Sequence, residues 1–201
     1  RVLEGTEGAY SPFWSPDGRS IGFISGLYRM KKIDISVIIP CLNEVNGVGV
    51  VVLDLQKTLK KVKKLRWEIL VVDNGSTDAS ASVAKRAGAK VFTERRRGYG
   101  RAYRTGMAKA RGEVLVMVDA DGTYDVSSIP AMYRQIKDGA DIVIGSRNID
   151  DIAHFSWLKK KLQRRGSAVV RLLSGTDVDD ATSGFRAFTR EEAFRLNVIS
   201  S

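Results

Sequence analysis

A regular alternation of apolar runs and helix-period segments, beginning at residue 33, constrains the fold more than any other feature of this chain. Residues 33–39 form a nearly continuous apolar run that ends at Pro40, which is typical of a strand buried on both faces. Further strands are predicted at 67–72, 91–92, 114–118 and 141–144. The helices predicted between the strands are at 48–62, 100–110 and 129–136, with a short alanine-rich helix that follows residue 78 and ends near residue 87. This order predicts an α/β fold in which a mostly parallel sheet is flanked by helices on both faces.

The first 29 residues follow a different pattern. Residues 9–14 and 19–24 are rich in aromatic and β-branched side chains and flank a Pro-Asp-Gly turn at residues 16–18, which predicts a β-hairpin. The stretch 9–25 resembles one repeat of the WD40-like propeller family. Because a propeller needs several stacked blades, we interpret residues 1–29 as a hairpin extension, either a remnant or fusion or a docking tag, and residues 30–201 as the main domain.

Composition excludes several classes of protein. A single cysteine, Cys41, and a single histidine, His154, exclude a disulfide framework and zinc sites rich in cysteine or histidine. No run reaches the roughly 18 apolar residues of a membrane span. The net charge is +10, and residues 1–29 carry three arginines against three acidic residues, so the excess lies in residues 30–201. This charge favours an anionic ligand, a nucleic acid or an anionic membrane surface.

The sharpest local signal is Asp119-Ala120-Asp121, directly after the strand predicted at 114–118. Residues i and i+2 on a chain that leaves a strand can point the same way, so Asp119 and Asp121 can meet one Mg²⁺ or Mn²⁺ that also holds a diphosphate. Ligands of parallel sheets sit beyond the carboxyl ends of the strands, which is where this triplet falls.

Three further polar clusters follow predicted strands. They comprise Pro40, Asn43 and Glu44; Asp73, Gly75 and Ser76; and Arg97 and Gly98. A proline turn with a helix start also explains the first cluster, and helix capping explains Thr77 and Asp78 but not Asp73. In the third, arginines before two glycines that open a helix favour an anion at the helix N-terminus, although exposed arginines are often only solvated.

In order and spacing, these clusters resemble glycosyltransferase family 2, with its GT-A fold, and within it the polyprenyl-phosphate branch that includes dolichyl-phosphate mannose synthases. The resemblance runs from Ile33 to Phe188 and includes the matching motifs at 145–147 and 180–186. It implies a GDP-mannose or UDP-hexose donor in the pocket formed by the three clusters, Mg²⁺ or Mn²⁺ at the catalytic Asp119 and Asp121, and a polyprenyl or dolichyl phosphate acceptor. The residues it assigns to the acceptor phosphate are Arg147, Lys160, Arg164, Ser183 and Arg186.

A phosphate acceptor explains why no general base stands out. A phosphate already carries about 1.5 to 2 negative charges at pH 7 and acts as its own nucleophile, whereas a sugar hydroxyl needs a base to take its proton. The basic amphipathic segment at 158–173 also suits a membrane surface, so we expect a cytoplasmic protein in peripheral contact with an anionic membrane.

The chain departs from this branch in three respects. Lys160 and Arg164 stand where the branch usually has an arginine and a serine, and Cys41 occupies an often aromatic position. The family continues beyond the point where this sequence ends, so we expect a C-terminally truncated domain.

Three rival functions stay open. The same fold can transfer sugar to a polysaccharide or glycan hydroxyl, or the domain can be an inactive module that binds nucleotide or a membrane surface. Nucleic-acid binding driven by charge is the third, and the absence of a recognition motif with interleaved aromatic residues argues against it.

Overall fold

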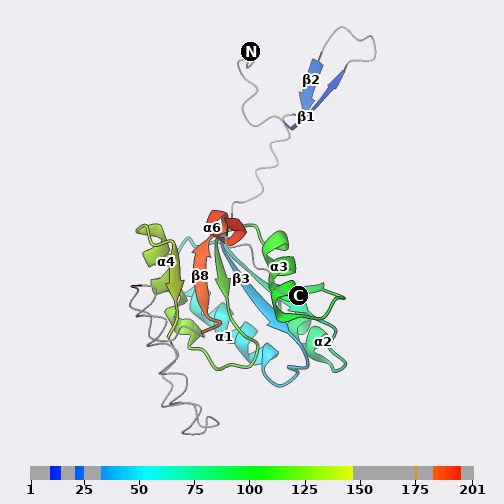
Figure 1. Cartoon of the computed structure of the whole chain (residues 1–201), viewed down its shortest axis with the longest axis vertical. Coiled ribbons are helices and arrows are strands. Elements are labelled where there is room, and N and C mark those ends of the chain that lie inside the picture. The colour runs from blue at the N-terminus through cyan, green and yellow to red at the C-terminus, as the bar shows by residue number, and fades with distance from the viewer. Residues whose placement is uncertain (1–9, 15–20, 25–32, 147–174, 176–182, 196–201) are drawn as a thin grey trace. The chain divides into compact units, whose positions relative to one another are not determined.

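The computed structural model describes residues 10–14, 21–24, 33–146, 175 and 183–195 (Figure 1). The chain divides into two compact units, residues 1–32 and residues 33–201. In the first unit, β1 (Tyr10–Trp14) and β2 (Ile21–Ile24) pair antiparallel, as the Pro-Asp-Gly turn predicts. The register shifts between Tyr10 and Pro12, where proline has no N–H to offer the ladder.

Within the described part of the second unit, six strands form one sheet in the order β5-β4-β3-β6-β8-β7. The strands are β3 (Ile33–Cys41), β4 (Trp67–Asp73), β5 (Lys90–Thr93), β6 (Gly112–Met117), β7 (Ile142–Ile144) and β8 (Arg186–Thr189). The strands β5, β4, β3 and β6 are parallel, and β8 runs antiparallel to both β6 and β7. The α/β fold with a mostly parallel sheet is therefore confirmed.

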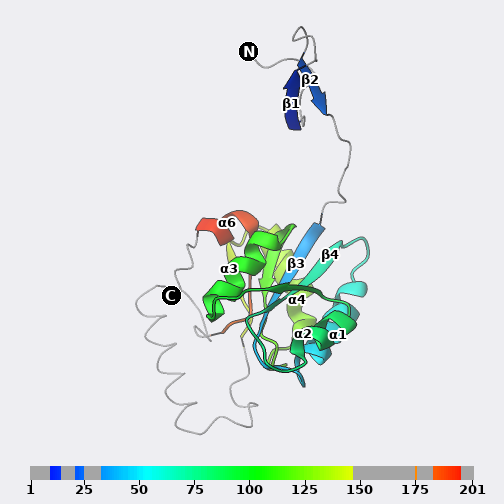
Figure 2. The ribbon, with the colours of Figure 1, turned by 90° about the vertical axis from the view of Figure 1, so that its right-hand side faces the viewer.

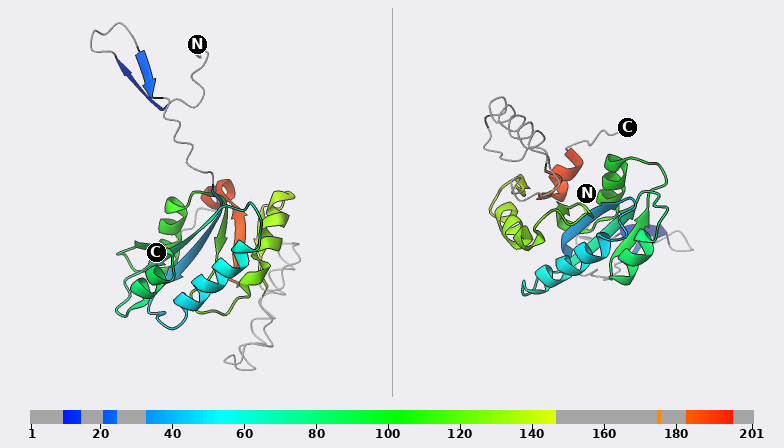
Figure 3. Two further views of the ribbon diagram at one scale, coloured as in Figure 1. Left: turned by 180° about the vertical axis from the view of Figure 1, so that it is seen from behind. Right: turned by 90° about the horizontal axis from the view of Figure 1, so that it is seen from below.

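Helices cover both faces of this sheet. They are α1 (Val48–Lys60), α2 (Ser80–Arg86), α3 (Tyr99–Lys109), α4 (Ile129–Lys137) with the preceding 3₁₀ turn η1 (Val126–Ser128), and α6 (Arg190–Arg195). Figure 2 shows α3 and α6 on one side of β3 and α1 and α2 on the other, and the left view of Figure 3 shows α1 crossing its face of the sheet.

The central strand β3 is buried on both faces, which explains its nearly continuous apolar run. Ile35, Val37 and Ile39 belong to the core shared with α1, α2 and α4, while Ile38 points into the core under α3. This alternation follows from the two-residue period of a strand. Burial of each such side chain contributes roughly 1.5–3 kcal/mol, so this strand anchors the domain.

A glycine lets α3 lie close to the sheet. A Cβ at Gly106 would collide with Ile38 Cγ2 and come within 3.2 Å of Val72 Cγ2. The absence of a side chain at this position sets the depth of α3 on β3 and β4, and with it the position of the loop and helix start around Gly98.

A buried carboxylate ties the amino ends of the strands together. Glu68, 5% exposed, accepts hydrogen bonds from Ser36 Oγ at 2.8 Å, Lys90 Nζ at 2.8 Å, and the backbone N and guanidinium of Arg111 at 2.8 and 2.9 Å. Burial opposes ionisation of Glu68, but the hydrogen bonds from Lys90, Arg111 and Ser36 outweigh it and lower its pKa to about 2. This network joins β3, β4, β5 and the start of β6.

One strand was missed by sequence reasoning. Residues 186–189, of sequence Arg-Ala-Phe-Thr, form β8 between β6 and β7, with Ala187 opposite both Val116 and Val143. Four residues that include a charged one give too short a pattern to distinguish a strand from a loop. Across the described residues, no helix combines the length and the apolar character that membrane crossing requires.

Candidate active site

Asp119 and Asp121 lie in the loop after β6, two and four residues beyond Met117, at the carboxyl end of the strand. Asp119 Oδ1 accepts a hydrogen bond from the Tyr99 hydroxyl at 2.6 Å. Asp121 Oδ1 accepts from the backbone N and Oγ1 of Thr123 at 3.0 and 2.9 Å. Among the described residues, no hydrogen-bond donor contacts Oδ2 of either aspartate, so each keeps one oxygen for a ligand.

A cavity of about 300 Å³ lies beside these aspartates. It is lined by Pro40, Cys41, Leu42, Glu44, Asn74, Gly98, Tyr99, Ala102, Asp119, Ala120 and Asp121. The lining residues come from the end of β3, from the loops after β3, β4, β5 and β6, and from the start of α3. The structure thus brings the predicted residues Pro40, Glu44, Gly98, Asp119 and Asp121 to one place, because parallel strands end at the same edge.

The cavity is strongly acidic. Burial raises the pKa of the Glu44 carboxyl, and the nearby charges of Asp121, Asp78 and Asp119 raise it further. Within the described ranges, no lysine or arginine forms an ion pair with Glu44, Asp119 or Asp121. A cation placed here would relieve this repulsion.

The donor set fits a metal ion that shares its coordination with a ligand. Among the described residues, no three histidine, cysteine, aspartate or glutamate side chains converge as a complete metal site. Asp119 and Asp121 nevertheless offer two carboxylate oxygens, and Mg²⁺ is commonly held by one or two carboxylates with substrate phosphates and water. The residues present are therefore compatible with a metal–diphosphate complex.

Asn43, Gly75 and Ser76 join two loops and do not line the cavity. The Asn43 backbone adopts φ +57° and its N–H donates to Ser76 Oγ at 3.0 Å, while its Oδ1 accepts from the backbone N of Thr77 at 2.8 Å. Gly75 lies at φ +85°, which glycine adopts without strain. These residues fix the loop after β3 against the loop after β4.

The loop after β4 also positions the arginine-rich segment. Asp73 is buried and its Oδ1 accepts from Ser76 N at 3.2 Å, outside the cavity lining. Asn74 accepts from Gly98 N at 2.7 Å and donates to the carbonyl oxygens of Glu94 and Arg96 at 3.0 and 2.9 Å. Asn74 therefore sets the path of residues 94–98, a role that sequence reasoning missed.

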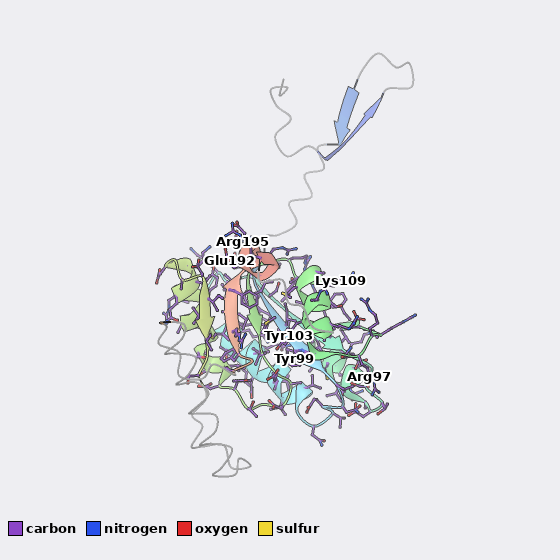
Figure 4. All side chains as sticks on the ribbon, in the orientation of Figure 1. Arg97, Tyr99, Tyr103, Lys109, Glu192 and Arg195 are labelled. Carbon is purple, nitrogen blue, oxygen red and sulfur yellow. The ribbon has the colours of Figure 1, made fainter. Side chains whose placement is uncertain are left out.

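Arg97 is exposed at the tip of this segment (Figure 4). Among the described residues it forms no ion pair, and it does not line the cavity. Its side chain is thus available to an anion that approaches from solvent.

A second cavity of about 490 Å³ adjoins the first, and Tyr99 and Asp119 line both. The predicted acceptor residues Ser183 and Arg186 lie in its wall: Ser183 Oγ donates to Gly145 O at 2.6 Å, and Arg186 Nε donates to Ser183 O at 2.8 Å. The rest of the wall is largely apolar and consists of Gly100, Tyr103, Met107, Met117, Tyr124, Ile142, Ile144, Gly184, Phe188 and Ala193. Arg147, Lys160 and Arg164 lie outside the described residues.

Tyr99 and Tyr103 are the site residues that sequence reasoning most clearly missed. Their rings meet edge to face with centroids 4.8 Å apart. The signal in the sequence is that Tyr99 follows Gly98 and Tyr103 comes four residues later, a spacing that places both tyrosines on one face of the helix. Nothing in the sequence, however, shows that this face meets Asp119.

Comparison with known proteins identifies the family to which this α/β domain belongs. Residues 36–195 match the family described as Glycosyl transferase family 2. A dolichyl-phosphate hexose transferase from Haloferax volcanii is 33% identical over 162 residues, which cover 79% of this chain and 67% of that protein. The chain belongs to glycosyl transferase family 2.

Other similarities agree with this assignment. An uncharacterized glycosyltransferase from Mycobacterium tuberculosis is 35% identical over 63% of this chain and 54% of its own length. The crystal structure of glucosyl-3-phosphoglycerate synthase from the same organism, with Mn²⁺, UDP-glucose and phosphoglyceric acid, has a TM-score of 0.62 at 25% identity and covers 79% of this chain and 57% of that one.

The chain spans about half the length of the glycosyltransferase from Mycobacterium tuberculosis that it matches. The family match begins at residue 36, and these comparisons lend no support to the resemblance of residues 9–25 to a propeller repeat.

Proposed function

We propose that this chain is the donor-binding and catalytic domain of an inverting, metal-dependent hexosyltransferase that moves mannose or glucose from a nucleotide-diphosphate sugar to a polyprenyl or dolichyl phosphate. The observation that carries the proposal is the pair Asp119 and Asp121 at the end of β6, each with one oxygen unengaged beside a cavity. The similarity to a dolichyl-phosphate hexose transferase supports the acceptor class.

In this proposal the first cavity takes the nucleotide of GDP-mannose or a UDP-hexose. Pro40, Glu44 and Gly98 form its wall. Asn43, Asp73, Gly75 and Ser76 complete the base and ribose side by holding the loops that carry this wall, and Arg97 reaches the diphosphate from solvent.

Asp119 and Asp121 would hold the metal ion. When bound, Mg²⁺ or Mn²⁺ neutralises the charge that develops on the diphosphate leaving group. Both metals occur in structures of the glucosyl-3-phosphoglycerate synthase, which supports either ion here.

The acceptor side lies next to the second cavity. A phosphate oxygen of the acceptor forms a bond to the anomeric carbon while the bond from that carbon to the diphosphate breaks on the opposite face, which inverts the configuration. The acceptor enters already charged, so no side chain has to remove a proton. Ser183 and Arg186, together with Arg147, Lys160 and Arg164, would hold its phosphate.

A lipid acceptor also implies a location. The basic residues 158–173 would meet the anionic cytoplasmic face of a membrane as a peripheral contact.

Residues 1–29 take no part in this chemistry and form a separate extension, with residues 30–201 as the transferase domain. The division of the chain after Lys32 supports a boundary near this point. A chain of residues 30–201 should unfold at the same urea concentration as the full chain, and a loss of cooperative unfolding would contradict this division.

A transfer assay tests the proposal. Labelled GDP-mannose or UDP-glucose is offered with Mn²⁺ and a polyprenyl phosphate, and label is measured in the lipid phase. Parallel reactions replace the lipid with 3-phosphoglycerate or with an oligosaccharide. Label in the lipid fraction alone supports the proposal, label in the oligosaccharide moves the activity to the hydroxyl-acceptor class, and metal-dependent nucleotide binding without transfer to any acceptor indicates an inactive binding module.

A further inference from the structure

The side of Asp119 that faces α3 is enclosed by tyrosines. Tyr99 is 55% exposed, yet its hydroxyl lies 2.6 Å from Asp119 Oδ1. The hydroxyls of Tyr99 and Tyr103 are hydrogen-bonded to each other at 3.2 Å, and that of Tyr103 lies 3.5 Å from the same carboxylate oxygen. Figure 4 shows the two tyrosines close together on α3.

This arrangement follows from the helix geometry. Residues four apart project from one helix face, and Gly106 allows α3 to approach the sheet closely, so the tyrosine pair reaches the carboxyl end of β6. An exposed tyrosine gains little from a hydrogen bond that water would supply equally well. A short bond to an ionised carboxylate is different, because charge-assisted hydrogen bonds are roughly twice as strong as neutral ones.

The opposite side of Asp119 is closed by a glycine. A Cβ at Gly184 would lie 2.8 Å from Asp119 Oδ2, 2.9 Å from the Tyr99 hydroxyl and 3.3 Å from the Tyr124 hydroxyl. The backbone N of Gly184 donates to that Tyr124 hydroxyl at 2.7 Å. The Asp119 carboxylate therefore lies in a slot between α3 and the residues just before β8. Tyr99 on one side and Gly184 on the other favour a single orientation of this carboxylate.

Resting on the proposed function, we infer that Tyr99 is a positioning residue for Asp119, with Tyr103 in a supporting role. The Tyr99 hydroxyl engages Oδ1 while Gly184 packs against Oδ2, so the carboxylate is held in one orientation for the metal–diphosphate complex. A hydroxyl suits this task because it holds an ionised carboxylate without adding a positive charge that would repel the metal. Since Asp119 lies in the wall of both cavities, the hydroxyl also fixes the carboxylate at the boundary between donor and acceptor.

The experiment removes single hydroxyls from the full-length chain. Tyr99→Phe and Tyr103→Phe keep the rings and their edge-to-face contact, and Tyr133→Phe on α4 is the matched control at a distance from the site. Binding of GDP and UDP is measured by calorimetry with and without Mn²⁺, and thermal unfolding checks the fold.

We expect Tyr99→Phe to weaken Mn²⁺-dependent nucleotide binding by about 10- to 100-fold, the range set by a hydrogen bond to a charged group. Metal-free nucleotide binding should stay unchanged, and the melting temperature should fall by only about 2–4 °C, the shift expected for loss of one hydrogen bond. A merely structural role for the hydroxyl would instead weaken metal-free and metal-dependent binding alike. Tyr103→Phe should lose no more than about threefold, because its contact with Asp119 is longer. Metal-dependent binding by Tyr99→Phe equal to that by Tyr133→Phe would overturn the inference.

A crystal structure of Tyr99→Phe separates this inference from the proposed function. If the wild-type chain itself binds no nucleotide with Mn²⁺, the proposed function fails, and the Asp119 carboxylate in the variant then decides the positioning role alone. A reoriented carboxylate supports that role, and a carboxylate in the wild-type position refutes it.

Discussion

The carboxylates at the two ends of the sheet differ in whether a lysine or arginine balances their charge. At the amino ends, Glu68 is buried and its charge is matched by Lys90 and Arg111. At the carboxyl ends, Asp119 and Asp121 lie beside Glu44, and the described residues supply none of them with an ion-pair partner. The difference fits a structural role for Glu68 and the cation site proposed at Asp119 and Asp121.

The largest effect should come from Asp121→Ala, which removes a carboxylate at the functional end. We expect transfer to fall by at least about 1,000-fold, or about 4 kcal/mol in the activation barrier. The free energy of unfolding should change by less than about 1 kcal/mol, because Asp121 is exposed. Urea unfolding measures the change in stability, and the lipid-phase assay measures the loss of transfer. Full transfer activity in this variant would refute the assigned role.

Glu68→Gln makes the complementary change at the structural end. It leaves Lys90 and Arg111 without their carboxylate, although both cations are nearly half exposed and water screens part of the loss. We expect a cost of about 2–4 kcal/mol in the free energy of unfolding, measured in urea. Asp54→Asn, which breaks only the exposed 3.0 Å pair with Lys57, is the control and should cost less than about 0.5 kcal/mol. Equal costs for the two variants would remove the contrast between the ends.

Acid should lower the free energy of unfolding by protonating Glu68 at the amino ends of the strands. The folded-state pKa of Glu68 is lowered from 4.5 to about 2, so its contribution is fully present above pH 4.5 and is lost as the pH falls toward 2. Urea unfolding between pH 6 and pH 2.5 should show a decline in wild-type stability that is smaller in Glu68→Gln. Parallel curves for the two proteins would contradict the lowered pKa.

The smallest effect should come from Glu44→Gln. The raised pKa of Glu44 means that its ionised form destabilises the fold above that pKa, and this penalty disappears as the pH falls below 4.5. At pH 7 without divalent metal, the substitution should stabilise the chain by less than about 1 kcal/mol. Saturation with Mn²⁺ and GDP should reduce or reverse the gain, as measured by thermal unfolding, whereas a loss of stability without metal would show that the cluster is not repulsive.

Much of the fold is predictable because its signals are local. The apolar run 33–39 and the helix-period segments locate the parallel strands and their helices, and the rule that parallel strands end at one edge gathers Pro40, Glu44, Gly98 and the two aspartates. No comparable signal exists for β8, whose four residues become a strand only through pairing with β6 and β7.

The unpredicted part of the site depends on distant contacts. The bond from Tyr99 to Asp119 spans 20 residues, and the contact of Tyr103 with the same carboxylate spans 16. Such pairs are set by the depth and rotation of α3 and the turn that follows it, which composition and periodicity do not encode. Arg147, Lys160 and Arg164, which lie outside the described residues, stay predictions.

The position of β8 has a consequence for synthesis of the chain on the ribosome. Within the described residues β7 pairs only with β8, and β8 is made more than 40 residues later. Until residue 189 has emerged, the nascent chain carries β6 as an open edge and β7 without its neighbour, a state exposed to pairing with other chains. Four of the six described strands, β3, β4, β5 and β6, can assemble early, but addition of β7 waits for the same short segment that brings Gly184 against Asp119. Completion of the described sheet and closure of the slot around Asp119 are therefore a single late event.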